Sequence, residues 1–320
     1  MIDKIKPINV EATLQWEKDI HIEKVDQSFP SISVVIPIFN AGKFLEKTLR
    51  SLLCNDLSGV QIILMDGGST DDTMNIVNHY KEIFSHVQSK KDKGQSDAIN
   101  NGFQIASGEI LYWLNGDDII LPNKITLARR YFRQHKECDV LVGNAFMTEI
   151  DFKPINHFIF SKEKLKFEFL LDYAKNHLIQ PSVFFTRKAW DYYGILDIND
   201  HYAMDADLFI SLARKFEFHH LNEDMAYSVY HEDCKTRGAR AESIISLALV
   251  QAKHGGINEA GNTLQIMVNM FKELQKKYEN VSSTTNDSKI AILEAKLKSI
   301  ESLIQLKKES LLVANLEANQ

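Results

Sequence analysis

The chain has 320 residues, of which 44% are hydrophobic and 25% are charged, with a net charge of −6 and a pI near 6.0. These values are typical of a globular protein with one large domain or two modest ones, and the acidic balance argues against a nucleic-acid-binding protein. Three widely spaced cysteines, Cys54, Cys138 and Cys234, argue against a disulfide framework or a C-x-x-C zinc site and favour a reducing compartment.

The first 240 residues alternate between short apolar runs and helical periodicity, after a polar segment at 1–30 that we expect to lie as an arm on the domain. This alternation predicts parallel βαβ units with right-handed crossovers. In the first part of the domain we expect a strand at 31–39, a helix at 43–53, a strand at 60–65, helices at 71–84 and 96–106, a strand at 110–114 and a helix at 122–134. In the second part we expect a strand at 139–144, a helix at 163–173, a strand at 181–185, helices at 187–193 and 203–216, and strands at 218–221 and 225–230.

Residues 241–320 form a helical extension with different character from the preceding domain at 31–240. We expect an amphipathic helix at 241–278, a polar break at 282–288 and a last helix at 289–317. Apolar residues in this last helix follow alternating spacings of four and three, as in a short coiled coil. The pattern predicts pairing, either with a second copy of the chain in a homo-oligomer or with an earlier helix.

A turn with two adjacent acids, Asn115-Gly116-Asp117-Asp118, directly follows the buried run at 110–114. In an open α/β sheet, ligands lie beyond the carboxyl ends of the strands. Mg²⁺ and Mn²⁺ commonly take one or two carboxylates together with substrate phosphates. A solvated turn would use the same residue types, so the turn alone supports both interpretations.

Three further polar clusters follow predicted strands or begin predicted helices. They are Asp66-Gly67-Gly68-Ser69, Gly94-Gln95-Ser96-Asp97 and Asp205. The first either forms part of a ligand pocket or is a tight turn that needs glycine. Asp97 and Asp205 stand at helix N-termini, where a carboxylate stabilises the helix and where anionic ligands are also favoured.

Five ordered motifs resemble those of an inverting glycosyltransferase of family 2 with the GT-A fold. They are the segments 35–40 (VIPIFN), 65–71 (MDGGSTD), 92–100 (DKGQSDAIN), 114–118 (LNGDD) and 205–208 (DADL), and the resemblance covers about 31–238. It implies an α/β, Rossmann-like mixed sheet flanked by helices. The implied activity is metal-dependent transfer of a sugar, with inversion, from a nucleotide-sugar donor to an acceptor hydroxyl during polysaccharide or glycan assembly.

The resemblance also assigns roles to residues at matching positions. Asp205 would be the catalytic base, with Asp207 as its rival, and Asp117 with His231 would hold Mn²⁺ or Mg²⁺, unless His231 is a bystander. Residues expected to bind the nucleotide or donor are Pro37, Phe39, Asn40, Asp66, Gly94, Gln95, Asp97, Asn115, Gly116, Asp118 and Lys235. The chain departs from the family pattern at Gly67, Asn115 and Met204, where an acid is usual. The change at Gly67 leaves the base of the nucleotide open. The change at Asn115 removes one acid of the metal motif but keeps Asp117, and the change at Met204 leaves the hydrogen bonding beside Asp205 open.

Two other activities remain open from the sequence. A nucleotidyltransferase would share a nucleotide pocket and an acidic metal site, without needing Asp205 as a base. A degenerate nucleotide-sugar-binding module could use the C-terminal helices to join a larger assembly. The expected acceptor is a glycan or a lipid-linked molecule. Because the chain lacks both an apolar signal core and a run of about 18 apolar residues, we expect a cytoplasmic protein that is either free or peripheral to the inner face of the membrane.

Overall fold

The computed structural model describes residues 5–232, 234, 239–282, 295 and 298. The chain divides into two compact units, one of Met1–Phe167 with Leu178–His231 and one of Glu168–His177 with Glu232–Gln320. Lys235 and nearly all of the expected coiled coil at 289–317 lie outside the described residues. Within the described part of the chain, no helix is both long enough and apolar enough to cross a membrane.

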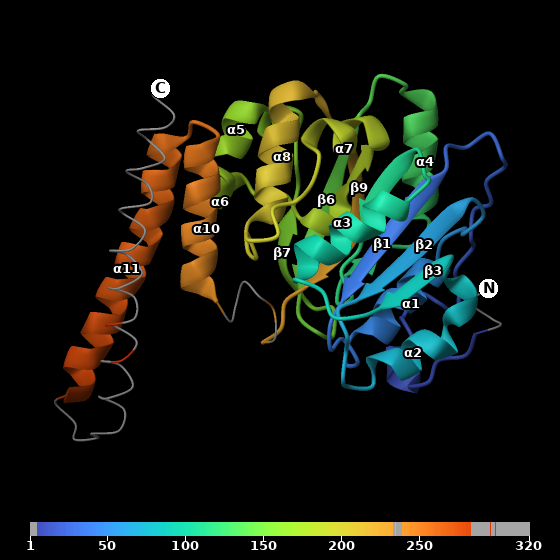
Figure 1. Cartoon of the computed structure of the whole chain (residues 1–320), viewed down its shortest axis with the longest axis horizontal. Coiled ribbons are helices and arrows are strands. Elements are labelled where there is room, and N and C mark those ends of the chain that lie inside the picture. Colours follow the sequence, from blue (N-terminus) through green and yellow to red (C-terminus); the bar gives the residue numbers. More distant parts are fainter. Residues whose placement is uncertain (1–4, 233, 235–238, 283–294, 296–297, 299–320) are drawn as a thin grey trace. The chain divides into compact units, whose positions relative to one another are not determined.

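A nine-stranded mixed sheet forms the centre of the larger unit (Figure 1). Its order is β3-β2-β1-β4-β8-β6-β9-β5, and β7 pairs with β6 outside this path. The strands are β1 (Ile32–Ile38), β2 (Val60–Asp66), β3 (His86–Ser89), β4 (Ile110–Trp113), β5 (Ile119–Ile120), β6 (Val140–Thr148), β7 (Pro154–Phe158), β8 (Val183–Thr186) and β9 (Phe218–Val229).

The two halves of this sheet differ in direction. Strands β3, β2, β1 and β4 are parallel throughout, whereas β8 runs antiparallel to both β4 and β6, and β5 runs antiparallel to β9. Strand β6 pairs in parallel with β9 and antiparallel with β7. Because β1, β2 and β4 point the same way, the polar turns that follow them lie at one edge of the sheet.

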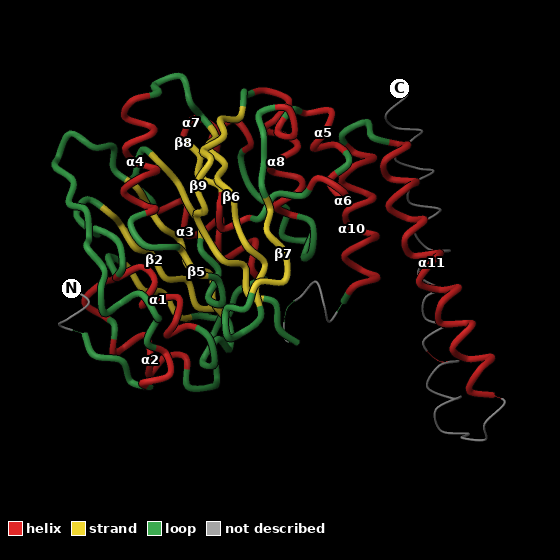
Figure 2. Tube along the Cα trace, turned by 180° about the vertical axis from the view of Figure 1, so that it is seen from behind, coloured by secondary structure: helices red, strands yellow, loops and turns green. Residues whose placement is uncertain are grey.

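Helices cover both faces of the sheet. They are α1 (Leu45–Leu53), α2 (Thr73–His79), α3 (Gln95–Ile105), α4 (Lys124–Gln134), α7 (Arg187–Tyr193) and α8 (Met204–Lys215). Alternate residues of β1, including Ile32 and Val34, face a core shared with α1, α2 and α4. On the other face, a side chain at Gly102 of α3 would meet Val35 Cγ1 at 2.4 Å, so α3 packs close against β1. Figure 1 shows α3 in front of the strands, and Figure 2 shows the strands in front of α3.

The segment that precedes β1 is attached to α1 by buried charged groups. Arg50 forms an ion pair with Glu17, and both side chains are nearly inaccessible to solvent. Arg50 also donates to the carbonyl oxygen of Ile5 at 3.1 Å. The carboxylate of Glu46 accepts hydrogen bonds from the backbone N–H of Ile8 at 2.6 Å and from the hydroxyl of Tyr80 at 2.8 Å. Residues 5–17 therefore complete a polar network on the outer side of α1.

The smaller unit contains α6 (Tyr173–Asn176), α10 (Arg240–Lys253) and α11 (Ile257–Ser282), together with most of α5 (Phe167–Leu171). Ala248 and Ala252 of α10 pack against Ala260 of α11. Gln251 connects two parts of this unit, since it accepts from the Thr263 hydroxyl at 2.6 Å and donates to the carbonyl oxygen of Leu171 at 3.0 Å.

Several predicted elements are wrong in detail. The helical region expected at 241–278 is present as two helices, α10 and α11, which are separated at Gly255 with its φ of +90°. The helix expected at 163–173 is a 3-10 turn followed by α5 and α6, and the helix expected at 71–84 ends at His79. The two strands expected at 218–221 and 225–230 are one strand, β9, whose apparent gap is a shift of register against Gly143 and Asn144. Strands β3, β5 and β7 were not predicted.

Candidate active site

The turns after β1 and β2 are tied to each other by side chains of their own. Asn40, with a φ of +49°, donates its backbone N–H to the Ser69 hydroxyl at 2.7 Å and accepts from the backbone N–H of Thr70 at 2.9 Å. The buried carboxylate of Asp66 accepts from the backbone N–H of Ser69 at 3.1 Å and from the Ser89 hydroxyl at 2.5 Å. Asp66 thus organises the turn after β2, and Phe39, in the turn after β1, is 64% exposed.

The first turn of α3 contributes a second group of polar side chains to this edge. The Asp97 carboxylate accepts from the backbone N–H of Lys93 at 3.1 Å and from the Asn101 amide at 3.2 Å, so it stabilises the start of the helix. Gln95 points to the turn after β4, where its amide donates to Oδ1 of Asn115 at 2.7 Å. Gly94 has a φ of +112°, a conformation that glycine adopts without a steric penalty.

Asn115 is the central residue of the turn after β4. Its amide nitrogen donates to the carboxylate of Asp118 at 2.9 Å and to Oε1 of Gln180 at 3.2 Å. Gln180 in turn donates to the carbonyl oxygen of Trp113 at 2.9 Å. A side chain at Gly116 would come within 2.7 Å of Ile38 Cγ2, because the turn lies directly against the end of β1, in which Pro37 is buried.

Asp118 faces the interior of the protein. It is 4% exposed, and its carboxylate accepts from the Asn115 amide and from the backbone N–H of Val229 at 3.2 Å. Burial, together with the neighbouring charge of Asp117, raises the pKa of Asp118 to about 8. The Asp118 carboxyl group therefore joins the turn to the end of β9.

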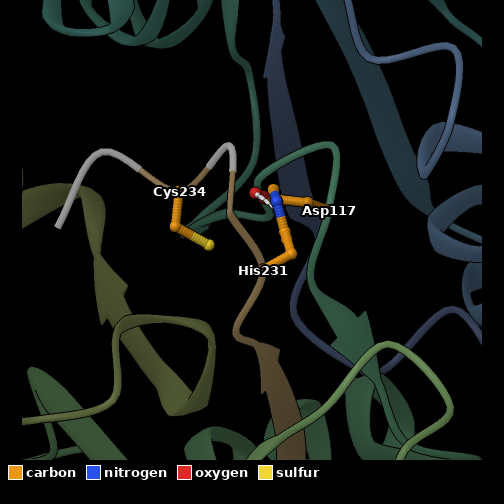
Figure 3. A group of neighbouring side chains, drawn as sticks. All are labelled: Asp117, His231 and Cys234. Carbon is orange, nitrogen blue, oxygen red and sulfur yellow. Dashed lines mark hydrogen bonds and ion pairs between the residues drawn. The ribbon is translucent and has the colours of Figure 1, made fainter. Parts of the chain in front are cut away.

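Asp117 faces outward and meets His231, which follows β9 (Figure 3). Oδ2 of Asp117 lies 3.0 Å from Nε2 of His231, and the imidazole stacks on the ring of Phe44 with the ring centroids 4.0 Å apart. The side chain of Asp117 is 33% exposed and that of His231 only 4%. Cys234, also drawn in Figure 3, follows three residues later in the chain and belongs to the smaller unit.

The donor atoms of Asp117 and His231 fit a divalent cation. The two atoms share a hydrogen bond in the structure, at 3.0 Å. Two neighbouring ligands of an octahedral ion with bonds of 2.0–2.1 Å also lie about 3.0 Å apart, so an ion could replace this hydrogen bond without moving either side chain far. The carboxylate oxygen of Asp117 suits Mg²⁺ and Mn²⁺, whereas the imidazole nitrogen of His231 favours transition-metal ions over Mg²⁺. The partial exposure of Asp117 leaves room for oxygen ligands from a substrate or from water.

The loop that leads into α8 is attached to the start of α3. Oδ1 of Asp200 accepts from the backbone N–H groups of Tyr202 and Ala203, both at 3.0 Å. The Ser96 hydroxyl lies 2.9 Å from the sulfur of Met204 and 3.3 Å from the carbonyl oxygen of Asp200. The loop 194–203 and the first turn of α3 therefore lie together at the carboxyl edge of the sheet.

The two acids in the first turn of α8 have different surroundings. Asp207 is 4% exposed and accepts from the hydroxyl of Tyr193 at 2.8 Å. Asp205 is partly exposed, and its carboxylate accepts from the adjacent N–H of Ala206 at 2.8 Å. Low-dielectric surroundings, and secondarily the charge of Asp200, raise the pKa of Asp205 to about 6. At neutral pH Asp205 is thus an ionised carboxylate with raised proton affinity.

The structure brings several sequence-predicted residues into contact with one another. Gln95, Asn115 and Asp118 form one hydrogen-bonded chain, and Asp117 with His231 forms a pair. From the sequence, Gln180 was a candidate for the border of an acceptor cleft, and the structure places its side chain against Asn115, 65 residues earlier. Its position in a 3-10 turn (Gln180–Ser182) gives no local sequence signal for this role.

A family model confirms the motifs. The model for glycosyl transferase family 2 matches residues 33–207, more than half of the chain. The chain belongs to this family. The match includes the turns after β1, β2 and β4, the start of α3, and both Asp205 and Asp207.

Similar sequences carry glycosyltransferase names. An uncharacterised glycosyltransferase of Rickettsia typhi is 28% identical over 220 residues, which is 66% of this chain and 67% of that protein. The chondroitin synthase of Escherichia coli is 24% identical over 212 residues, 63% of this chain but only 29% of the synthase. The chain therefore matches less than a third of that larger relative.

Solved structures establish the fold. TarS 1–349 of S. aureus, in complex with UDP-GlcNAc, aligns with a TM-score of 0.55 and 18% identity over 72% of each chain. The mannosyltransferase PcManGT of Pyrobaculum calidifontis, in complex with GDP-Man and Mn²⁺, aligns with a TM-score of 0.51 and 13% identity over 90% of this chain and 87% of that one. The mixed sheet with its flanking helices is therefore a GT-A fold, as the sequence predicted.

Proposed function

We propose that this chain transfers a sugar from a nucleotide-sugar donor to an acceptor hydroxyl with inversion at the anomeric carbon, and that it uses a divalent cation. The observation that carries the proposal is the pair of accessible acids, Asp117 beside His231 and Asp205 at the start of α8. Family membership and the nucleotide-sugar complexes of TarS and PcManGT support the donor class.

Asp205 would take the proton of the acceptor hydroxyl as that oxygen attacks the sugar. A single displacement of this kind needs one base and no enzyme nucleophile. A pKa of about 6 suits the task, because the carboxylate is ionised at neutral pH and yet binds a proton more strongly than an ordinary aspartate. Asp207, engaged with Tyr193, is the less suitable base.

Asp117 and His231 would hold the cation, either Mn²⁺ or Mg²⁺. Bound there, the ion would act as a Lewis acid on the departing diphosphate. The Asp117 carboxylate is a suitable ligand for these hard ions, whereas thiolate and thioether sulfur favour softer ones.

The donor itself would lie over the turns at the carboxyl edge of the sheet. Phe39 offers an exposed aromatic face, and Asn40 and Asp66 shape the neighbouring turns. Gly94 and Gln95 stand at the N-terminus of α3, which favours anionic groups such as a diphosphate. The remaining proposed donor contacts are Pro37, Asp97, Asn115, Gly116, Asp118 and Lys235.

The setting that we propose is the assembly of a polysaccharide or another glycan, with a glycan or lipid-linked acceptor. The relatives named chondroitin synthase and hyaluronan synthase support this setting. Two domain assignments accompany the proposal. Residues 31–240 would form the catalytic domain, and the last helix of the extension at 241–320 would pair with a second copy of the chain in a homo-oligomer or with an earlier helix. Peripheral association with a membrane is a separate proposal for the chain as a whole.

The products of the reaction test the proposal. The purified chain would be incubated with UDP-GlcNAc or GDP-Man, Mn²⁺ and a panel of glycan acceptors, and both nucleoside diphosphate and pyrophosphate would be measured. We expect nucleoside diphosphate in amounts that follow the glycosylated acceptor. Pyrophosphate would instead support a nucleotidyltransferase, and donor binding without either product would support a binding module.

A further inference from the structure

A second group of potential metal ligands lies away from the candidate active site. His135 ends α4, Glu137 lies in the following loop, and His219 is the second residue of β9. One ligand atom from each of the three side chains lies within 4.8 Å of the others. His219 and His231 stand near opposite ends of β9, roughly 30 Å apart along the strand. The two groups are therefore separate.

The distances within this group suit a small cation. In a tetrahedral zinc site with bonds of 2.0–2.1 Å, neighbouring ligand atoms lie roughly 3.3 Å apart. Nδ1 of His135 lies 3.3 Å from Oε1 of Glu137, so these two atoms already have the separation of neighbouring zinc ligands. The other ligand atoms lie within 4.8 Å and would need to approach by about 1.5 Å at most.

Tyr131 supports both imidazoles. Its hydroxyl lies 3.1 Å from Nδ1 of His219, and its ring stacks on that of His135 with the centroids 4.2 Å apart. A hydroxyl bound to one ring nitrogen fixes the orientation and tautomer of an imidazole, as outer-shell partners of metal-binding histidines do. Tyr131 is one turn before His135 in α4, so a regular helix sets its position.

The group lies at the surface of the larger unit. Glu137 is exposed, and His135 and His219 are half-buried, so an ion from solvent can reach the three side chains.

We propose that His135, Glu137 and His219 bind a borderline-soft divalent cation such as Zn²⁺, with Tyr131 as a positioning residue. Two imidazoles and one carboxylate are a ligand set that zinc accepts, with water in the fourth position, and imidazole nitrogen selects Zn²⁺ or Ni²⁺ over Mg²⁺. The ion would connect the loop between α4 and β6 to the beginning of β9. Its role would be to stabilise the fold, because the group lies far from Asp117 and Asp205.

Zinc titration of the full chain tests this proposal. The protein would be stripped with EDTA and titrated with Zn²⁺ against a competing indicator, in the Asp117→Ala background so that the candidate active site lacks its carboxylate. We expect one equivalent of Zn²⁺ to bind and to raise the unfolding temperature. His219→Asn and Glu137→Gln should each weaken binding by at least about 100-fold, and Tyr131→Phe by about 10-fold, as for the loss of an outer partner.

His86→Asn is the matched control, because His86 is an exposed histidine of β3 outside the group, and it should change nothing. Glu137 is exposed, so Glu137→Gln tests the site without disturbing the core even if His219→Asn fails to fold. Zinc binding that survives both Glu137→Gln and His135→Asn, or that disappears in the Asp117→Ala background alone, would overturn the proposal.

Discussion

The turn after β4 and the first turn of α8 each carry two acids, and in both places the two acids differ. Asp118 and Asp207 are each 4% exposed and accept hydrogen bonds from groups of the protein. Asp117 and Asp205 remain partly accessible. Residues two apart on an α-helix are rotated by about 200° about the helix axis. Asp205 and Asp207 therefore lie on different faces of α8 and contact different groups. In each pair, the buried acid stabilises the local backbone through its hydrogen bonds, and the accessible acid can contact a substrate or a metal ion.

The largest expected effect is the difference in transfer rate between the Asp205→Asn and Asp207→Asn variants. Asp205→Asn keeps the size of the side chain and removes the proton acceptor, so transfer should fall by roughly 10²–10⁴-fold while donor affinity is retained. The measurement is acceptor-dependent release of nucleoside diphosphate, with donor affinity measured separately by titration.

Asp207→Asn is the matched control for this change. Its amide oxygen can still accept from the Tyr193 hydroxyl, so we expect nearly normal transfer. An inactive Asp207→Asn beside an active Asp205→Asn would reverse the assignment of the two acids.

The next largest effect is the difference in transfer rate and Mn²⁺ stimulation between variants of Asp117 and of Asp118. Asp117→Ala removes the carboxylate proposed to hold the cation, and transfer should fall by about 10²–10³-fold, comparable to the loss of one group that stabilises developing charge. Stimulation by Mn²⁺ should disappear as well. The measurement is the transfer rate as a function of Mn²⁺ concentration in the wild type and the variant.

Asp118→Asn should behave differently from Asp117→Ala. Burial already favours the neutral form of Asp118, and an amide oxygen can accept the N–H of Val229. Stimulation by Mn²⁺ should therefore persist. If Asp117→Ala retains it as fully as Asp118→Asn does, the outward-facing acid does not hold the ion.

The smallest effect is a pH dependence that belongs to Asp205. A base acts in its ionised form, and the pKa of Asp205 is about 6. Transfer should therefore be constant above about pH 7 and should fall roughly tenfold for each pH unit below 6. The measurement is kcat/KM between pH 4.5 and 8. The residual activity of Asp205→Asn should not fall in this way at acidic pH. If the variant shows the same fall in kcat/KM below pH 6, the titrating group is not Asp205.

The sequence predicted the parallel half of the sheet better than the mixed half. Strands β1, β2 and β4 are continuous apolar runs that end in polar turns, and each was predicted within about two residues. β5 has only two residues and exists through pairing with Tyr227 and Ala226 of β9, more than 100 residues later. The mostly exposed residues of β3 and β7 have no apolar pattern. Pairings of this kind leave no local signal.

For the candidate site, the sequence identified the motifs and left their internal geometry open. Residues two apart on a helix lie on different faces, so the sequence alone implies that Asp205 and Asp207 differ in direction, but it does not say which one faces the interior. The hydroxyl of Tyr193, 14 residues earlier, makes that distinction. The contact of Gln180 with Asn115 likewise depends on how β8 returns to the sheet beside β4.

The polar network on the outer side of α1 has a consequence for how this domain can be divided. The family match begins at residue 33, yet earlier residues are the partners of two buried charged side chains of α1. Arg50 pairs with Glu17 and donates to the carbonyl oxygen of Ile5. Glu46 accepts from the backbone N–H of Ile8. Removal of one partner of a buried ion pair typically costs about 3–5 kcal/mol, a large share of the stability of an ordinary domain. A fragment that began at residue 33 would keep every proposed catalytic residue but would lose the partners of Arg50 and Glu46. The part of the chain needed for a stable fold is therefore longer at its N-terminal end than the family match.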